Sequence, residues 1–336
     1  MLSQHLQGLF HAMTTHKVPL IRCPTLTDLP APPAGKQGWP WTEESPALPP
    51  LKPDGTPWPR VSLVIPCLNA GPFLEESIRS LLLQRYGDLE IIIMDGGSSD
   101  ESMSIIRKYE PWLTHWESRP DRGQSHAINK GLAKCTGQFF NWHNADDLLL
   151  PGSLAQTVLG FDRYPDAVYL ARYRLLLDEA GTCTPKRREM PSRRIEDRDT
   201  FTVISGGSQP GGLMRLENVI AAGGVDEELE CCMDEDLQLR LLISGPAYFL
   251  EDPGFIFRVR PAQKSQSLTK LRVREKIRIH KSIYARLPEG DPRHTYRAAS
   301  IIFIHSWAAR LLWQKHHYAS ALLHVARSLI AKVSCR

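Results

Sequence analysis

The sequence predicts an α/β fold in which a mainly parallel sheet is covered by helices on both faces. Between residues 61 and 161, short continuous apolar runs alternate with segments of helical periodicity, a pattern typical of such sheets. Polar side chains follow three of the apolar runs, at Asn69, at Asp95 and at 144–147. Ligands bind beyond the carboxyl ends of parallel strands, so these clusters predict one site at a single edge of the sheet.

The composition is that of an ordinary globular protein with one large or two modest domains. The chain has 336 residues, of which 42% are hydrophobic and 23% charged, and its net charge is +4. This mild positive charge suits anionic partners such as nucleotides or a membrane surface, and we expect no nucleic acid partner. Seven cysteines without a C-x-x-C pair predict reduced thiols in a cytoplasmic setting.

Export and membrane-spanning segments are not expected. The first twenty residues lack the basic segment and apolar core of a signal peptide. The most apolar run, 298–313, is shorter than a spanning helix and contains His305 and Arg310. We therefore expect this run to be a helix packed on the folded body.

Residues 1–60 are expected to form an arm outside the sheet. Proline is dense from residue 24 to residue 60, and proline blocks both helices and central strands. Trp39, Trp41 and Trp58 are unusual in a solvated linker, which predicts that the arm lies against the folded body.

The elements of the sheet begin at residue 61. Apolar, β-branched runs predict strands at 61–66 and 89–94. The helix between them is predicted from apolar residues at i, i+4, i+7 and i+8 within 74–82, and residues 98–100 are candidate caps of the next helix. Further elements are expected in this order: strand 113–118, helix 123–137, strand 138–142, helix 150–161, strands within 167–186, mostly loop at 193–212, helices 215–224 and 233–245, strand 247–259, and two or three helices from 268.

Asp146 and Asp147 stand side by side in the stretch NWHNADDLLLP, directly after a predicted buried strand. Like charges this close repel each other unless solvent or a cation offsets them. The pair therefore indicates either a hydrated turn or a cation site.

Five motifs, taken in order, resemble the family 2 glycosyltransferases, which have the GT-A fold, a Rossmann-like nucleotide-binding mixed sheet flanked by helices. The motifs are VSLVIPCLNAGPFLEESIRSLLLQ, EIIIMDGGSSDESMSII, PDRGQSHAINKG, NADDLLLPG and GGVDEELECCMDEDLQLRL. The resemblance assigns 61–267 to a glycosyltransferase domain and 268–336 to a C-terminal helical region. It implies transfer of a sugar from a nucleotide diphosphate, which we expect to be UDP, to an acceptor hydroxyl, with inversion of the anomeric configuration. Processive, membrane-embedded relatives carry a Q-x-x-R-W motif that this sequence lacks.

The resemblance also implies a site for the sugar donor. Its candidate contacts to the nucleotide and the sugar are Pro66, Asn69, Asp95, Asp121, Asn129, Asp146, Gln209 and Arg260. Asp147, with Asp146, is the candidate ligand of a Mg²⁺ or Mn²⁺ ion, with Asp146 the contact to sugar or ribose. Arg260 stands where relatives often carry a histidine near the metal, and an arginine can grip the pyrophosphate instead.

Two departures from the family pattern bear on this site. The second strand is followed by DGG, so Asp95 is its single acid, which leaves base recognition open. Asn144 stands in place of the first acid of the metal motif and brings no charge, so metal affinity depends on the remaining carboxylates and the phosphates.

Asp234 matches the family's general base, the group that takes the proton of the acceptor hydroxyl. The alternative is that it only complements the dipole of the predicted helix 233–245, in whose first turn it lies. Asp236 and Arg240 are i, i+4 neighbours and are expected to pair, whereas Glu235 is expected to face solvent.

The helix expected at 268–287 is strongly basic, with Glu275 as its single acid. It either presents a solvated face or lies on anionic lipid, and the second alternative gains if the acceptor is lipid-linked. The expected activity is inverting sugar transfer to a saccharide or lipid-linked acceptor, in polysaccharide or glycoconjugate synthesis, in the cytoplasm or at the inner face of the membrane. A catalytically inactive sugar-nucleotide binder and a nucleotidyltransferase are the alternatives; the second would need an early glycine-rich phosphate segment, which IPCLNAGPF is not.

Overall fold

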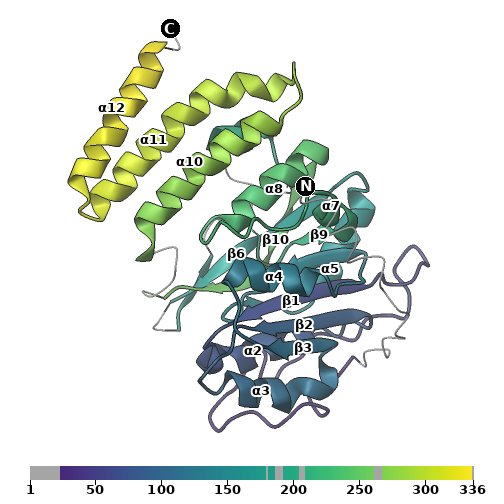
Figure 1. Cartoon of the computed structure of the whole chain (residues 1–336). Coiled ribbons are helices and arrows are strands. Elements are labelled where there is room, and N and C mark those ends of the chain that lie inside the picture. The colour runs from purple at the N-terminus through teal and green to yellow at the C-terminus, as the bar shows by residue number, and fades with distance from the viewer. Residues whose placement is uncertain (1–22, 179–180, 186–191, 204–208, 261–266, 335–336) are drawn as a thin grey trace.

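In the computed structural model, a mixed sheet flanked by helices forms the body of the molecule, and three long helices extend from one side (Figure 1). The structure describes residues 23–178, 181–185, 192–203, 209–260 and 267–334. Ten strands within these ranges form one sheet. Their bounds are β1 Val61–Cys67, β2 Leu89–Asp95, β3 His115–Ser118, β4 Phe139–Trp142, β5 Leu148–Leu149, β6 Tyr169–Leu177, β7 Cys183–Pro185, β8 Arg193–Arg194, β9 Leu213–Arg215 and β10 Ala247–Arg258.

The strands that carry the predicted polar clusters are parallel neighbours. The sheet order is β3-β2-β1-β4-β9-β6-β10-β5, and β3, β2, β1 and β4 all run in the same direction. Their carboxyl ends therefore open onto one edge of the sheet. Beyond them β9 runs antiparallel to both β4 and β6, which makes the sheet mixed.

Helices cover both faces of the sheet, which explains why β1 and β2 are buried along their whole length and mostly apolar. In β1, Leu63 and Ile65 pack into one core cluster with α2, α3 and α5, while Val64 between them packs into a second cluster with α4, α7 and α8. The helices are α2 Gly71–Leu82, α3 Ser102–Tyr109, η1 Glu110–Trp112, α4 Gln124–Leu132, α5 Ser153–Arg163, α6 Asp197–Val203, α7 Leu216–Ala221, α8 Met233–Ser244, α10 Thr269–Arg286, η2 Pro292–Tyr296, α11 Arg297–Gln314 and α12 Tyr318–Ser334.

The predicted strands and helices of the sheet are confirmed in type and order, but the short strands β5 and β9 were not predicted, and there are three further local errors. Helix α4 ends at Leu132 instead of continuing to residue 137. The region 193–212, predicted as mostly loop, contains β8 and α6, whose Phe201 is fully buried in the core. The N-cap of α3 is Glu101; the carboxylate of Asp100 instead accepts hydrogen bonds from the backbone N–H groups of Ser102 and Gly71.

The proline-rich arm lies against the folded body, as predicted. Trp39 donates its indole N–H to the carbonyl oxygen of Leu149, 2.8 Å away. The guanidinium of Arg79, fully buried in α2, donates to three arm carbonyl oxygens and to one hydroxyl; these belong to Pro30, Pro40, Trp41 and Tyr109. The arm therefore supplies hydrogen-bond partners to a charge in the interior.

The C-terminal helices α10, α11 and α12 lie in a row, with α12 outermost (Figure 1). Helix α10 joins the main core through Ile279, Ile283 and Tyr284, so the predicted basic helix has one face buried against the protein. Helix α11 packs on α10, α12 and α6, as expected for the apolar run 298–313. Among the described helices, none combines the length and the apolar character needed to cross a bilayer.

Candidate active site

The loop after β2 closes around the side chain of Asp95. Its carboxylate, 1% exposed, accepts hydrogen bonds from the hydroxyls of Ser98 and Ser118, at 2.5 and 2.6 Å, and from the backbone N–H groups of Gly97 and Ser98. Burial alone would raise the pKa of Asp95, but these hydrogen bonds outweigh it and hold the pKa below its usual range. The geometry makes Asp95 the organiser of a tight turn at the edge of the sheet.

Residues from two other segments border this turn. Pro66 is buried in β1 opposite Met94, and Asn69, exposed just beyond β1, accepts a hydrogen bond from the backbone N–H of Ser99 at 2.9 Å. Asp121 lies directly against the turn, because a Cβ added to Gly96 would come within 2.8 Å of its carboxylate. Asp121 is half-buried, and its carboxylate lies beside the carboxyl ends of the strands.

Asn129 is committed to a different contact. Its side-chain amide donates to the carbonyl oxygen of Val225 and to Glu227, and its oxygen accepts from the backbone N–H of Val225 at 3.0 Å. These bonds tie α4 to the loop that leads toward α8. The predicted contact between Asn129 and a nucleotide stays a prediction.

Asp147 is buried beneath the turn that follows β4. It is 1% exposed, and its carboxylate accepts from the amide of Asn144 at 2.8 Å and from the backbone N–H of Arg258 at 3.3 Å. Burial, together with the neighbouring charge of Asp146, raises its pKa. Asn144 also accepts from the amide of Gln124, which joins this turn to the start of α4.

Asp146 is the more open acid of the pair and has a cationic partner. Its carboxylate forms an ion pair with Arg260, and the two side chains are 17% and 36% exposed. Arg258 donates to the backbone carbonyl oxygen of Asp146 and pairs with Glu76 at 2.7 Å. Both guanidinium groups lie over the ring of Phe73, within 5.0 Å of its centre. The end of β10 and the residues that follow it therefore place two arginines beside residues 144–147, which we call the acidic turn.

Asp234 lies in the first turn of α8, and burial followed by the nearby charge of Glu235 raises its pKa to about 6. A carboxylate with such a pKa is largely ionised at neutral pH and still basic enough to accept a proton. The predicted pair of Asp236 and Arg240 is confirmed at 2.7 Å, with both side chains 6% exposed.

The prediction that Glu235 faces solvent is wrong. It pairs with Lys276 of α10 at 2.8 Å, and the two side chains are 14% and 6% exposed. Next to it on α10, Glu275 accepts hydrogen bonds from three consecutive backbone N–H groups, of Glu230, Cys231 and Cys232. Helix α10 therefore fixes the entry to α8, the helix that carries Asp234.

Arg174 of β6 is a charged residue of this region that was not predicted from the sequence. Burial lowers the pKa of Arg174, and the charges of Asp147 and Asp234 oppose this lowering, so both carboxylates are among its charged neighbours. Its guanidinium lies 5.0 Å from the ring centre of Phe257 on β10. An arginine within the apolar run YLARYRLLL is the signal in the sequence that could have identified it.

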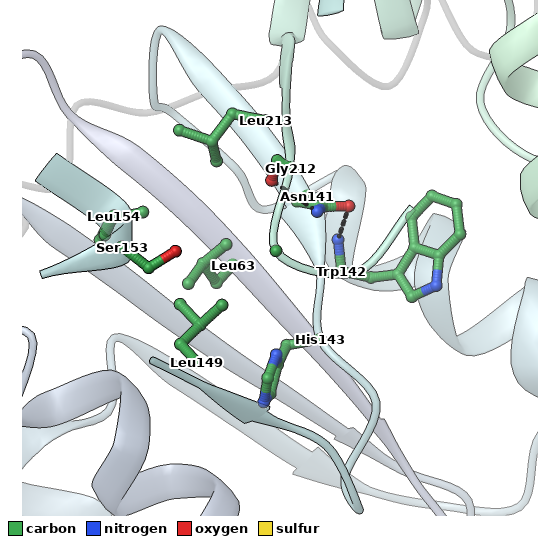
Figure 2. A pocket seen from close by; sticks show the side chains of 10 residues that line it. Leu63, Asn141, Trp142, His143, Leu149, Ser153, Leu154, Gly212 and Leu213 are labelled. Atoms are coloured by element: carbon green, nitrogen blue, oxygen red, sulfur yellow. Dashed lines mark hydrogen bonds between the residues drawn. The ribbon is translucent and has the colours of Figure 1, made fainter. Parts of the chain in front are cut away.

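Gln209 and a small cavity lie beside β4, the strand that precedes the acidic turn. Gln209 is 4% exposed and donates its amide to Asn141 and to the carbonyl oxygen of Trp142, at 2.6 and 2.5 Å. Figure 2 shows the adjacent cavity, where His143 and Ser153 lie among leucine side chains. At about 10 Å³ it is barely large enough for one water molecule, so it is not a nucleotide site.

Comparison with known sequences identifies the domain. Residues 62–220 match the model of glycosyl transferase family 2. An uncharacterized glycosyltransferase of Rickettsia prowazekii is 31% identical over 213 residues, which cover 62% of this chain and 66% of that protein. The chain spans about two thirds or less of the length of the first curated relatives that it matches, including 38% for a relative from Mycobacterium tuberculosis.

Comparison with solved structures places the fold among the GT-A glycosyltransferases. The mannosyltransferase PcManGT from Pyrobaculum calidifontis, in complex with GDP-Man and Mn²⁺, aligns over 98% of this chain and 82% of its own, with a TM-score of 0.56 and 16% identity. S. aureus TarS 1-349 in complex with UDP-GlcNAc aligns over 81% of this chain and 89% of its own, with a TM-score of 0.55 and 15% identity. The predicted fold class is confirmed.

Proposed function

Because this chain is a glycosyltransferase of family 2, we propose that it transfers a sugar from a nucleotide-diphosphate sugar, UDP-linked, to an acceptor hydroxyl with inversion, in polysaccharide or glycoconjugate synthesis. The observation that carries the proposal is the parallel pairing of β1 with β2 and β4, which brings Asn69, Asp95 and the turn after β4 to one edge of the sheet. Arg174, whose pKa is influenced by the charges of both Asp147 and Asp234, supports assigning the turn after β4 and the first turn of α8, 87 positions apart in sequence, to the same polar site. Nucleotide-sugar complexes of the two aligned structures support this class of sugar donor.

Asp234 is the proposed general base. It accepts the proton of the acceptor hydroxyl while that oxygen bonds to the anomeric carbon of the sugar. The bond between the anomeric carbon and the diphosphate oxygen breaks, and its electron pair leaves with the nucleotide diphosphate. Attack from the face opposite the leaving group inverts the configuration. A pKa of about 6 leaves Asp234 mainly ionised at pH 7, as this role requires.

Arginine side chains are proposed to neutralise the leaving diphosphate. Arg260 is partly exposed, and its Nε is buried without a hydrogen-bond partner among the described residues. The exposed part of this guanidinium suits a phosphate oxygen. Arg174, which has Asp147 and Asp234 among its charged neighbours, is proposed to provide a second positive charge. Asn69 and Asp121, at the strand ends, are the proposed contacts to ribose and base.

The residues of the acidic turn fit a divalent ion that is shared with the sugar donor. Within the described ranges, no cluster of three or more His, Cys, Asp or Glu side chains is arranged to hold a metal by itself. Mg²⁺ commonly binds through one or two carboxylates and completes its shell with phosphates and water, and there it stabilises the leaving charge. We propose the more open Asp146 as the ligand and the buried Asp147 as the residue that shapes the turn, which reverses the roles expected from sequence.

A screen of sugar donors tests the proposal. The purified chain is incubated with UDP-, GDP- and TDP-linked sugars and Mn²⁺, and released nucleoside diphosphate is measured. We expect release from at least one UDP-sugar and its loss in Asp234→Asn, which should still bind the donor in calorimetry. The matched control, Asp166→Asn, changes an exposed aspartate outside the site and should keep full turnover. Full turnover in Asp234→Asn would remove the base assignment, and donor binding without turnover in the wild type would indicate an inactive binder.

A further inference from the structure

Helix α12 is polar on its inner face. The side chains that it buries against α11 include Ala321, His324 and Ser328. His324 shares a hydrogen bond of 2.8 Å with His305, and Ser328 shares one of 2.8 Å with Ser306. This helix therefore turns small and hydrogen-bonding side chains toward the protein, the reverse of an ordinary surface helix.

The outer face of α12 is apolar. Its large exposed side chains are Leu322, Leu323, Val325, Leu329 and Ile330, each between 43% and 65% exposed. At 3.6 residues per turn these five fall within one arc of roughly 160°. Exposed apolar side chains scattered singly need no explanation, but a contiguous face of this kind marks a surface that is covered by a partner.

Aromatic side chains lie at one end of this face. Trp313, near the end of α11, and Tyr318, at the start of α12, are 54% and 46% exposed. Their rings meet edge to face with centres 4.8 Å apart. Trp and Tyr with an exposed apolar body and a polar tip are the side chains that favour the boundary between lipid headgroups and acyl chains.

The charges around the face have a single sign. Residues 292–336 contain no Asp or Glu. Helical spacing puts the exposed Arg327 and Lys332 on opposite borders of the apolar arc, and the exposed Arg310 and Lys315 lie near the aromatic end. Two copies of this face would oppose like charges, which disfavours self-association. An anionic surface complements the same charges.

We propose that the outer face of α12, with Trp313 and Tyr318, docks on an anionic phospholipid surface. Leu322 and Leu329, one above the other on the helix, enter the boundary of the acyl chains, while Arg327 and Lys332 extend to the phosphates. The proposal goes beyond sugar transfer and moves the lipid contact from the predicted helix 268–287, whose inner face is buried, to the outermost helix of the chain.

Sedimentation with vesicles tests the proposal on the full chain without any sugar donor, so its outcome is independent of activity. The vesicles are phosphatidylcholine alone, or two parts phosphatidylcholine to one part phosphatidylglycerol. We expect binding to the anionic vesicles only. The double variant Leu322→Glu/Leu329→Glu should weaken it at least about tenfold, because about two buried leucines are replaced by charges. Arg327→Gln should weaken it about fivefold, the effect of one basic residue near such a surface.

The matched control is Leu51→Glu, which alters a leucine of the arm that is 48% exposed and should leave vesicle binding unchanged. Thermal unfolding of each variant checks that the fold is retained. Equal binding to neutral and anionic vesicles would overturn the proposal, as would no binding to either. A dimer in light scattering that the double variant dissociates, without vesicle binding, would assign the face to a second copy of the chain and overturn the lipid contact.

Discussion

The raised pKa of Asp234 predicts that its replacement by asparagine abolishes turnover and stabilises the fold. Folding raises the pKa from the ordinary value of 3.8 to about 6, and each unit corresponds to 1.36 kcal/mol. The ionised form therefore costs the folded state about 3 kcal/mol. Asparagine avoids this cost, and the favourable interaction of the carboxylate with the first turn of α8 is already contained in the net pKa. The expected net gain at pH 7 is about 3 kcal/mol.

The pH dependence gives this prediction a distinctive sign. A carboxyl group with a raised folded pKa binds its proton more tightly in the folded state than in the unfolded state. The wild type therefore loses stability relative to Asp234→Asn as the pH rises from about 4 to about 6, and carries the full cost above that. Urea unfolding of both proteins at pH 4 and at pH 7 should show a difference that is small at pH 4 and about 3 kcal/mol at pH 7.

A neighbouring aspartate provides the contrasting control. Asp236 forms a buried ion pair with Arg240, so Asp236→Asn leaves the guanidinium without its charged partner and should destabilise the fold by about 3 kcal/mol. Two aspartates on one turn of α8 should thus respond with opposite signs. An Asp234→Asn variant that is less stable than the wild type at pH 7, or a gain that persists at pH 4, would refute the reasoning from burial.

Further predictions concern the pH profile, the metal and the helix α10. The kcat/KM should fall below pH 6 with a slope of one, because Asp234 must lose its proton; a flat profile from pH 5 to 8 would exclude this base. Arg260→Gln should raise the KM for the sugar donor about tenfold and strengthen Mn²⁺ binding without nucleotide, because Asp146 loses its ion-pair partner; an unchanged Mn²⁺ titration in calorimetry would contradict this. Chelation by EDTA should stop turnover, and Mn²⁺ or Mg²⁺ should restore it. Glu275→Gln should lower the free energy of unfolding by about 2 kcal/mol and also lower kcat, whereas Glu228→Gln, at a side chain 77% exposed, should change neither.

The edge of the sheet was predictable because its strands are nearly continuous apolar runs. Once β1, β2 and β4 are parallel neighbours, the residues after them must meet at one edge. The pair of Asp236 and Arg240 was predictable for a similar reason, since helical spacing alone brings the two side chains together.

The contacts that depend on distant segments were not predictable from local pattern. The buried pairing of Glu235 requires Lys276, 41 positions away, and the ion pair of Asp146 requires Arg260 from beyond β10. The contact between α10 and the start of α8, the helix that carries Asp234, also joins distant segments. The basic composition of α10 does not indicate it. Local sequence sets the period of a helix, whereas packing decides which of its charged side chains are buried.

The position of Arg79 has a consequence for where the domain can be cut. A shortened chain that begins at Val61 would contain the whole segment matched by the family model and still lack Pro30, Pro40 and Trp41. The guanidinium would then keep only the hydroxyl of Tyr109 among these partners, in an interior that water reaches poorly. The segment that folds cooperatively therefore begins well before β1. The bounds of the family match, 62–220, do not define this folding unit.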